Sequence, residues 1–304
     1  MYYPQTKTFE FDYQGAKLSV NLSLEAQVDQ QYELAPHSFS YSGTLPKNWR
    51  ESYYAMYLSH ASDQVAIGEL LDQLQALQPG ASRDERAEMA VAFVQGAITY
   101  DWDTFHNIDQ GRIRYPYETL WDGTGVCADK SILLAKLLTN LGYGVVFFTY
   151  ERANHMALGI QAPAGFGSYR TAYAFVESTS YTPIGRIPDT YIGGIRLERN
   201  PLVVAAKGAG RAIFEKISSN QEAEKQLEGQ FGKDFLMMRP EQQTLRKQMV
   251  VMEAELEEMK KQMRGCRGTL APEKFRVCQE LQEKHNRQVQ AYNQLVADFN
   301  GLSA

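Results

Sequence analysis

Alternating apolar and polar residues open the chain. Every second residue is aromatic over Phe9–Tyr13 and aliphatic over Leu18–Leu24, and Gln14-Gly15 separates the two runs. A period of two is typical of strands with one buried face, and a glycine turn between two such runs predicts a β-hairpin. We therefore expect strands up to about residue 45, within an N-terminal β-rich region over residues 1–60.

A helical period follows this region. The aromatic stretch Tyr41–Tyr57 has no clear period and is assigned as a connection. Apolar residues then recur every three or four positions over Asp63–Leu77, and Pro79-Gly80 marks the end of that helix. A second helix is expected to begin at the capping box Ser82–Glu85 and to extend to about Tyr100.

The middle of the chain combines one helix with three short strands. A polar and aromatic loop rich in turn residues leads into a helix over Cys127–Asn140. Three β-like runs follow, at Val145–Tyr150, Met156–Ile160 and Ala172–Glu177. Because a helix followed by an antiparallel meander is typical of α+β proteins, we expect residues 61–200 to form an α+β core.

The last third of the chain follows a heptad pattern. From Pro240, apolar residues are separated alternately by four and three positions, and after a turn at Gly268–Pro272 a second series returns in mirror order. This pattern predicts an antiparallel coiled-coil hairpin over about residues 240–300, within a helical region at 201–304. The seam residues are Leu245, Met249, Met252, Leu256, Met259, Met263 and Cys266, and then Cys278, Leu281, His285, Val289, Tyr292, Leu295 and Phe299.

Two cysteines face each other in this predicted hairpin. The mirror order puts Cys266 opposite Cys278 near the turn, within the distance that a disulfide spans. A disulfide there would clamp the tip of an arm that has little core of its own, and it would indicate an oxidising compartment. The alternative is two reduced cysteines that pack as seam residues in a cytosolic protein. A zinc site with His285 lacks a fourth ligand.

Composition narrows the classes of protein. The chain has 304 residues, of which 44% are hydrophobic, so it can bury a sizeable core and is long enough for more than one domain. A net charge of −5 with interspersed acids and bases argues against nucleic acid or an anionic membrane surface as the partner. No apolar run reaches the ~20 residues of a membrane helix, and the N-terminus lacks the pattern of a leader.

One cysteine, one histidine and one glutamate are the candidates for chemistry. Cys127 begins its helix, where unpaired N–H groups and the positive end of the helix dipole favour a thiolate. His155 starts the second of the three strands and Glu177 ends the third, so adjacent strands can carry a base and its orienting carboxylate. We predict Cys127 as nucleophile, His155 as general base and acid, and Glu177 as orienter.

Each of these residues also has an ordinary structural explanation. A lone cysteine is commonly a small buried apolar residue, a lone histidine is commonly structural, and a carboxylate at a strand end is commonly solvated. Asp129, in the first turn of the cysteine helix, can serve the helix dipole as well as a function. We predict no metal and no cofactor, because the other histidines lack metal-ligand spacing. They are His37, His60, His106 and His285.

Short motifs in the middle of the chain resemble those of a known family. Together and in this order, they are similar to the motifs of the transglutaminase-like superfamily of papain-like cysteine enzymes. The resemblance covers roughly residues 60–190 and implies a papain-like core. The motifs are Tyr115–Leu120 (YPYETL), Gly125–Asp129 (GVCAD), Leu141–Tyr143 (LGY), Asn154-His155 and Phe175–Thr179 (FVEST).

The resemblance implies roles for the same three residues. It implies Cys127 as nucleophile and His155 as base and acid, and Glu177 stands where most members have aspartate. The longer side chain can still accept a hydrogen bond from the imidazole. Members usually also have an oxyanion-hole side chain upstream of the cysteine. The candidates for it are Trp102, Tyr115 and Trp121, beside the backbone N–H of Cys127.

These features predict a cysteine protease or amidase that cleaves peptide or protein amide bonds through an acyl-enzyme. If an amine instead of water accepts the acyl group, the protein is a protein-glutamine transglutaminase. The alternative from another class is a non-catalytic binding or scaffold protein. The helical arm offers a face for self-association or for a protein partner. A Cys266–Cys278 disulfide favours a periplasmic, secreted or surface-exposed location.

Overall fold

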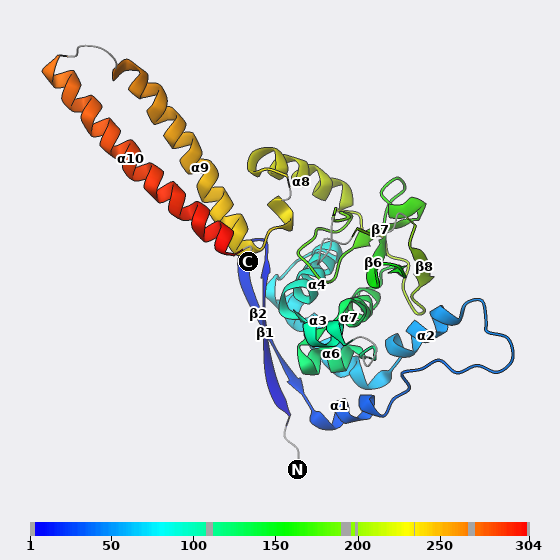
Figure 1. Cartoon of the computed structure of the whole chain (residues 1–304). Helices are drawn as coiled ribbons and strands as arrows, with labels where there is room; N and C mark the ends of the chain where they lie inside the picture. Colours follow the sequence, from blue (N-terminus) through cyan, green and yellow to red (C-terminus); the bar gives the residue numbers. More distant parts are fainter. Residues whose placement is uncertain are drawn as a thin grey trace. The chain divides into compact units, whose positions relative to one another are not determined.

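The chain folds into two compact units, Met1–Glu222 and Ala223–Ala304 (Figure 1). The coordinates are a computed structural model. The structure describes residues 4–107, 112–189, 196–197, 200–233, 235–266 and 271–302.

The first unit begins with the predicted β-hairpin. Strands β1 (Gln5–Tyr13) and β2 (Ala16–Leu24) pair antiparallel. The turn between them needs positive φ at Gln14 (51°) and at Gly15 (80°), which is the conformation that glycine adopts without strain. The apolar face of the hairpin is buried against two helices, α3 (Gln64–Leu77) and α4 (Arg83–Ala97).

Two further helices lie where the sequence predicted strands or a connection. Helix α1 (Ala26–Glu33) follows β2 directly, so the strands expected up to about residue 45 end earlier. Helix α2 (Trp49–Leu58) occupies most of the aromatic stretch. The reason is tertiary packing, because aromatic residues favour strands only weakly and here they fill a helix face. The ring of Tyr54, for example, packs at 4.7 Å on that of Phe147 in the central sheet.

The next two helices confirm the helical period. Helices α3 (Gln64–Leu77) and α4 (Arg83–Ala97) bury most of their predicted apolar residues, but Val65 of α3 is 81% exposed. The capping box is present, since Ser82 Oγ accepts from the Glu85 N–H at 3.2 Å and Glu85 Oε2 accepts from the Ser82 N–H at 2.8 Å.

The cysteine helix lies at the centre of the first unit. Helix α7 (Cys127–Asn140) is buried along almost its whole length, and it contacts α4 on one side and the central sheet on the other. This burial on all sides explains why its sequence is so rich in leucine. Shorter elements lead into it along the chain. They are β3 (Thr99–Tyr100), α5 (Trp102–His106), α6 (Pro116–Asp122) and β4 (Thr124–Gly125).

A four-stranded antiparallel sheet completes the first unit. Its order is β7-β6-β5-β8, so the predicted meander β5 (Val145–Tyr150), β6 (His155–Gln161) and β7 (Tyr173–Val176) is confirmed. Strand β8 (Leu202–Ala205) pairs with β5, although the sequence had assigned it to the helical region. The layers run from the hairpin through the helices to this sheet, which is the predicted α+β architecture (Figure 1).

The second unit contains the predicted helical hairpin. Helices α9 (Pro240–Met263) and α10 (Pro272–Gly301) pack together, and Cys266 and Cys278 form the predicted disulfide with their Cα atoms 5.7 Å apart. Of the predicted turn Gly268–Pro272, residues 268–270 lie outside the described residues. Helix α8 (Ile217–Phe231) crosses the boundary between the units.

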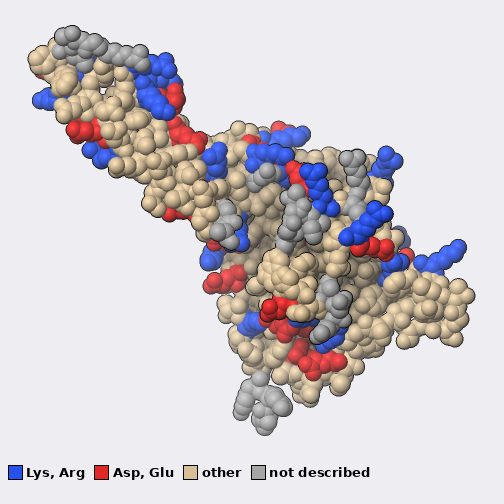
Figure 2. Space-filling model, viewed as in Figure 1, with Lys and Arg blue, Asp and Glu red and all other residues tan. Residues whose placement is uncertain are grey.

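Charged side chains are scattered over the surface. On the face in Figure 2, lysines and arginines alternate with aspartates and glutamates, and no basic side chains gather in one broad patch. Among the described residues, no helix is both long enough and apolar enough to cross a membrane.

Candidate active site

Cys127 is the first residue of α7 and is the free cysteine of the chain. Its side chain is 8% exposed, and its Sγ lies 3.8 Å from the carbonyl oxygen of Asn154. The thiol therefore sits at the positive end of a 14-residue helix and faces the turn that precedes β6.

His155 opens β6 and faces both predicted partners. It lies opposite Tyr150 in the register of β5 and β6, and its side chain is 11% exposed. The Nε2 atom lies 3.3 Å from Glu177 Oε2, and the imidazole also shares a hydrogen bond with the Cys127 side chain. Because Nε2 faces the carboxylate, Nδ1 is the ring nitrogen available to the thiol.

The register of the sheet explains how Glu177 reaches His155. Strands β6 and β7 pair Leu158 with Val176, so residue 177 falls opposite residue 157, on the same face as His155. Diagonal neighbours of this kind are about 7–8 Å apart, within reach of a long side chain. The structure thus gives a reason for glutamate, the one departure from the pattern that the resemblance implied.

The Glu177 carboxylate is fully buried. Its Oε1 atom, the oxygen that does not face His155, is held by hydrogen bonds. Oε1 accepts hydrogen bonds from the N–H groups of Ser178 (3.0 Å) and Thr179 (2.8 Å) and from the Thr179 hydroxyl (2.6 Å). These three donors leave Oε2 directed at the imidazole. A buried carboxylate is stable only when hydrogen-bond donors compensate for its lost hydration. Here the same donors also fix the orientation of the carboxylate toward His155.

The environment of His155 strongly favours its protonated form. Burial alone lowers the pKa of the imidazole, but the hydrogen bonds to Cys127 and Glu177 and the charges of both groups outweigh it and raise the pKa to about 10. A protonated imidazole between a thiol and a carboxylate is the arrangement that stabilises a thiolate.

Ser131 connects the three elements that carry these residues. It lies one turn after Cys127 on α7, and its hydroxyl donates to the Met156 carbonyl on β6 at 3.1 Å. Since that proton is used, the 3.0 Å contact with Ser178 Oγ is a bond that Ser178 donates. The helix start, the start of β6 and the end of β7 are therefore tied together by two buried hydrogen bonds.

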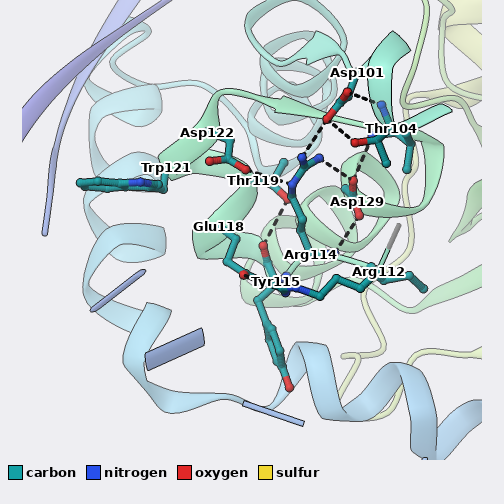
Figure 3. A network of polar contacts seen from close by, with 12 residues as sticks. Asp101, Thr104, Arg112, Arg114, Tyr115, Glu118, Thr119, Trp121, Asp122 and Asp129 are labelled. Carbon is teal, nitrogen blue, oxygen red and sulfur yellow. Dashed lines mark hydrogen bonds and ion pairs between the residues drawn. The ribbon is translucent and has the colours of Figure 1, made fainter. Parts of the chain in front are cut away.

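The three candidate oxyanion side chains lie in different environments. Tyr115 is fully buried, and its hydroxyl donates to the Pro36 carbonyl at 2.7 Å, so it is already used. The Trp121 ring points away from the polar network around Arg114 (Figure 3). Trp102 is 45% exposed and packs on the ring of Tyr100 at 4.9 Å.

Tyr100 is a residue that the sequence reasoning missed. Strand β3 pairs with β4 so that Tyr100 lies opposite Gly125, two residues before Cys127. Burial, and then the charges of Cys127 and Glu177, raise the pKa of the Tyr100 hydroxyl. Among the described residues, none forms a hydrogen bond with this hydroxyl. The only signal in the sequence was the aromatic pair Tyr100 and Trp102 directly after a helix.

Arg114 forms a second polar cluster in front of the cysteine helix (Figure 3). Its guanidinium contacts Asp101 Oδ2 at 2.8 Å, Asp122 Oδ2 at 3.0 Å and Asp129 Oδ2 at 3.2 Å. Asp129, which the sequence left open between a helix-dipole role and a function, is thus a buried partner of Arg114. Within the described residues, no cluster of three or more histidine, cysteine or acidic side chains could hold a metal ion.

Comparison with known proteins finds a match to a protein family. Residues 69–164 match the sequence profile of a family described as a transglutaminase-like domain (DUF553). The matched segment contains Cys127 and His155, whereas Glu177 lies beyond its end. This match supports the transglutaminase-like resemblance over residues 69–164. No curated protein and no solved structure matches the chain.

Proposed function

We propose that the protein is a thiol-dependent acyl-transfer enzyme that hydrolyses amide bonds of peptides or proteins. The observation that supports it best is the continuous contact from Cys127 through His155 to Glu177 at the start of α7. Nucleophile, base and orienter within hydrogen-bond reach are the requirement for nucleophilic catalysis.

In the first step, the Cys127 thiolate attacks the carbonyl carbon of the scissile amide. The negative charge that develops on the carbonyl oxygen needs donors, and the first N–H groups of α7 have no partner within the helix. The Tyr100 hydroxyl is the second donor in this proposal. His155, protonated at the start, gives its proton to the departing amine, and a thioester between Cys127 and the acyl group remains.

In the second step, neutral His155 takes a proton from water, which attacks the thioester. The carboxylic acid leaves, Cys127 returns to thiolate and His155 to imidazolium. Glu177 holds the ring in one tautomer and supports its charge during both steps. A primary amine in place of water would give a new amide, and this outcome would make the protein a transglutaminase.

The location that we propose is outside the cytoplasm. The Cys266–Cys278 disulfide supports it, because such bonds persist in oxidising compartments. The same disulfide leaves Cys127 as the single free thiol among the three cysteines of the chain, so thiol reagents report on one site.

The test of this proposal is the alkylation rate of Cys127 with iodoacetamide at pH 7. An ordinary thiol with a pKa of about 8.5 is about 3% ionised there, so a thiolate held by His155 should react roughly 10 to 30 times faster. His155→Ala should remove this advantage, and His285→Ala, in the arm, should keep it. Labelling of the wild type at the rate of an ordinary thiol would support the scaffold alternative instead.

Substrate profiling with peptide libraries then separates the two acyl acceptors. Hydrolysis predicts cleaved peptides with or without an added primary amine, and Cys127→Ala should yield none. Incorporation of the amine without cleavage would replace hydrolysis by transglutamination.

A further inference from the structure

Arg114 joins three separate segments of the first unit by one guanidinium group (Figure 3). Its Nη2 binds Asp101, which follows β3, its Nε binds Asp122, the last residue of α6, and its Nη1 binds Asp129 in the first turn of α7. The Arg114 side chain is 20% exposed and that of Asp129 is 0% exposed. Ion pairs this well buried are costly to break by removal of one partner.

Asp129 connects Arg114 to the start of the cysteine helix. Its Oδ1 accepts from the Arg114 backbone N–H at 2.8 Å, and its Oδ2 accepts from the N–H of Val126, the residue before Cys127, at 3.0 Å. A Cβ atom on Gly125 would lie 2.9 Å from Asp129 Cβ, so glycine is needed for this close approach. One carboxylate thus ties the backbone of Val126, directly before the proposed nucleophile, to the backbone of Arg114.

Asp101 connects Arg114 to the segment between β3 and α5. It accepts from the N–H and the hydroxyl of Thr104, both at 2.8 Å, and so caps the short helix α5. It also follows Tyr100, whose strand β3 pairs in parallel with β4 just before Cys127. The segment that carries Tyr100 and Trp102 is therefore held at a set distance from the helix start.

We propose that Arg114 is a positioning residue for Cys127. By binding Asp101, Asp122 and Asp129 together, it sets the position of the thiol relative to His155 on one side and to Tyr100 on the other. This inference rests on the proposed function, because positioning matters only if Cys127 reacts. Arginine suits the role because its planar fork presents donors in several fixed directions, whereas lysine presents one compact charge.

The test compares Arg114→Gln and Arg114→Lys with wild-type full-length protein. The measurement is the rate of Cys127 alkylation by iodoacetamide as a function of pH, together with the pKa of His155 from its NMR signal. For Arg114→Gln we expect a rate at pH 7 about ten times lower, a rate profile moved to higher pH and a lower His155 pKa, because the thiol and the imidazole separate. Arg114→Lys should recover part of the rate.

Arg112→Gln is the matched control. Arg112 lies in the same loop and binds Glu118 at 2.6 Å, but within the part of the chain that the structure describes it forms no hydrogen bond or ion pair with any of the three aspartates. It should leave the alkylation profile unchanged. An Arg114→Gln protein that folds and keeps the wild-type rate and His155 pKa would overturn the inference.

Two further outcomes are distinguishable. If Arg114→Gln does not fold, Asp101→Asn loosens the same contact with an isosteric change, and an unchanged alkylation profile in that variant would overturn the inference as well. If the wild-type thiol itself reacts at an ordinary rate, the proposed function fails before the role of Arg114 is in question.

Discussion

The two units of the chain reach their folds by different means. In the first unit, α7 is buried along most of its length, and Cys127 and Asp129 in its first turn contact residues distant in sequence. In the second, α9 buries only Met249, Leu256 and Met259, and α10 buries no residue. The first unit depends on many long-range contacts, whereas the arm depends on a narrow seam and a disulfide.

The two units differ in their electrostatics as well as in their packing. The Glu177 carboxylate has no exposure to solvent, so its charge acts strongly on His155. The charged pairs along the arm are exposed, as in Lys261 with Glu258, where both side chains are about 60% exposed. A single charge should therefore matter in the first unit and have little effect in the arm.

Removal of the Glu177 charge is the change with the largest expected effect. In Glu177→Gln the pKa of His155 should fall from about 10 by roughly 1 to 3, or about 1.4 to 4 kcal/mol, because the imidazolium loses its carboxylate. Glu177→Asp keeps the charge but not the reach, and should give an intermediate value. The measurement is NMR titration of the histidine signals, with His155→Ala to identify the signal and Glu253→Gln in the arm as the control.

The sign of the pH dependence follows from the same values. The folded pKa of His155 lies above the ordinary 6.5, so protonation stabilises the fold fully below about pH 6.5, and this contribution is lost as the pH rises toward 10. Wild-type stability to urea should decline over this range more than that of Glu177→Gln. A wild-type His155 that titrates near 6.5 would contradict the geometry of the site.

Removal of the disulfide should have the next largest effect, and only in the arm. Closing a loop of this length stabilises a fold by about 3 kcal/mol, so the Cys266→Ser, Cys278→Ser double variant should unfold its arm at lower temperature. All three tryptophans lie in the first unit, so their fluorescence reports on that unit, and far-UV circular dichroism reports on the arm helices as well. A fluorescence transition that moves together with the helical signal would show that the units are not independent.

The sequence predicted what depends on periodicity and order. The cysteine helix, the meander and the arm could each be predicted from the local pattern of their own residues. In the arm, this pattern alone placed Cys266 opposite Cys278. The catalytic candidates could be ordered because helix starts and strand ends are visible in the sequence. Their contacts in the structure agree with this order.

The features that the sequence did not predict depend on contacts without a local pattern. Helix α2 is stabilised by aromatic packing on the sheet, and β8 buries only Val204, so neither has a strong period. Arg114 binds three aspartates between residues 101 and 129 that belong to different segments, and no spacing rule connects them. Tyr100 became a candidate only when the pairing of β3 with β4 placed it opposite Gly125, two residues before Cys127.

The smallest expected effect comes from a pair of matched hydrogen bonds, one in each unit. Thr179 Oγ1 donates to Glu177, and the Tyr292 hydroxyl donates to Glu253 Oε1, both at 2.6 Å. Thr179→Val leaves a buried charge short of one donor and should cost about 1.5 to 3 kcal/mol in the tryptophan-detected transition. Tyr292→Phe removes an exposed bond and should change the helical transition by less than about 0.5 kcal/mol. Because the two bonds have the same length, equal losses of stability in the two variants would mean that burial does not make a hydrogen bond more important in the first unit than in the arm.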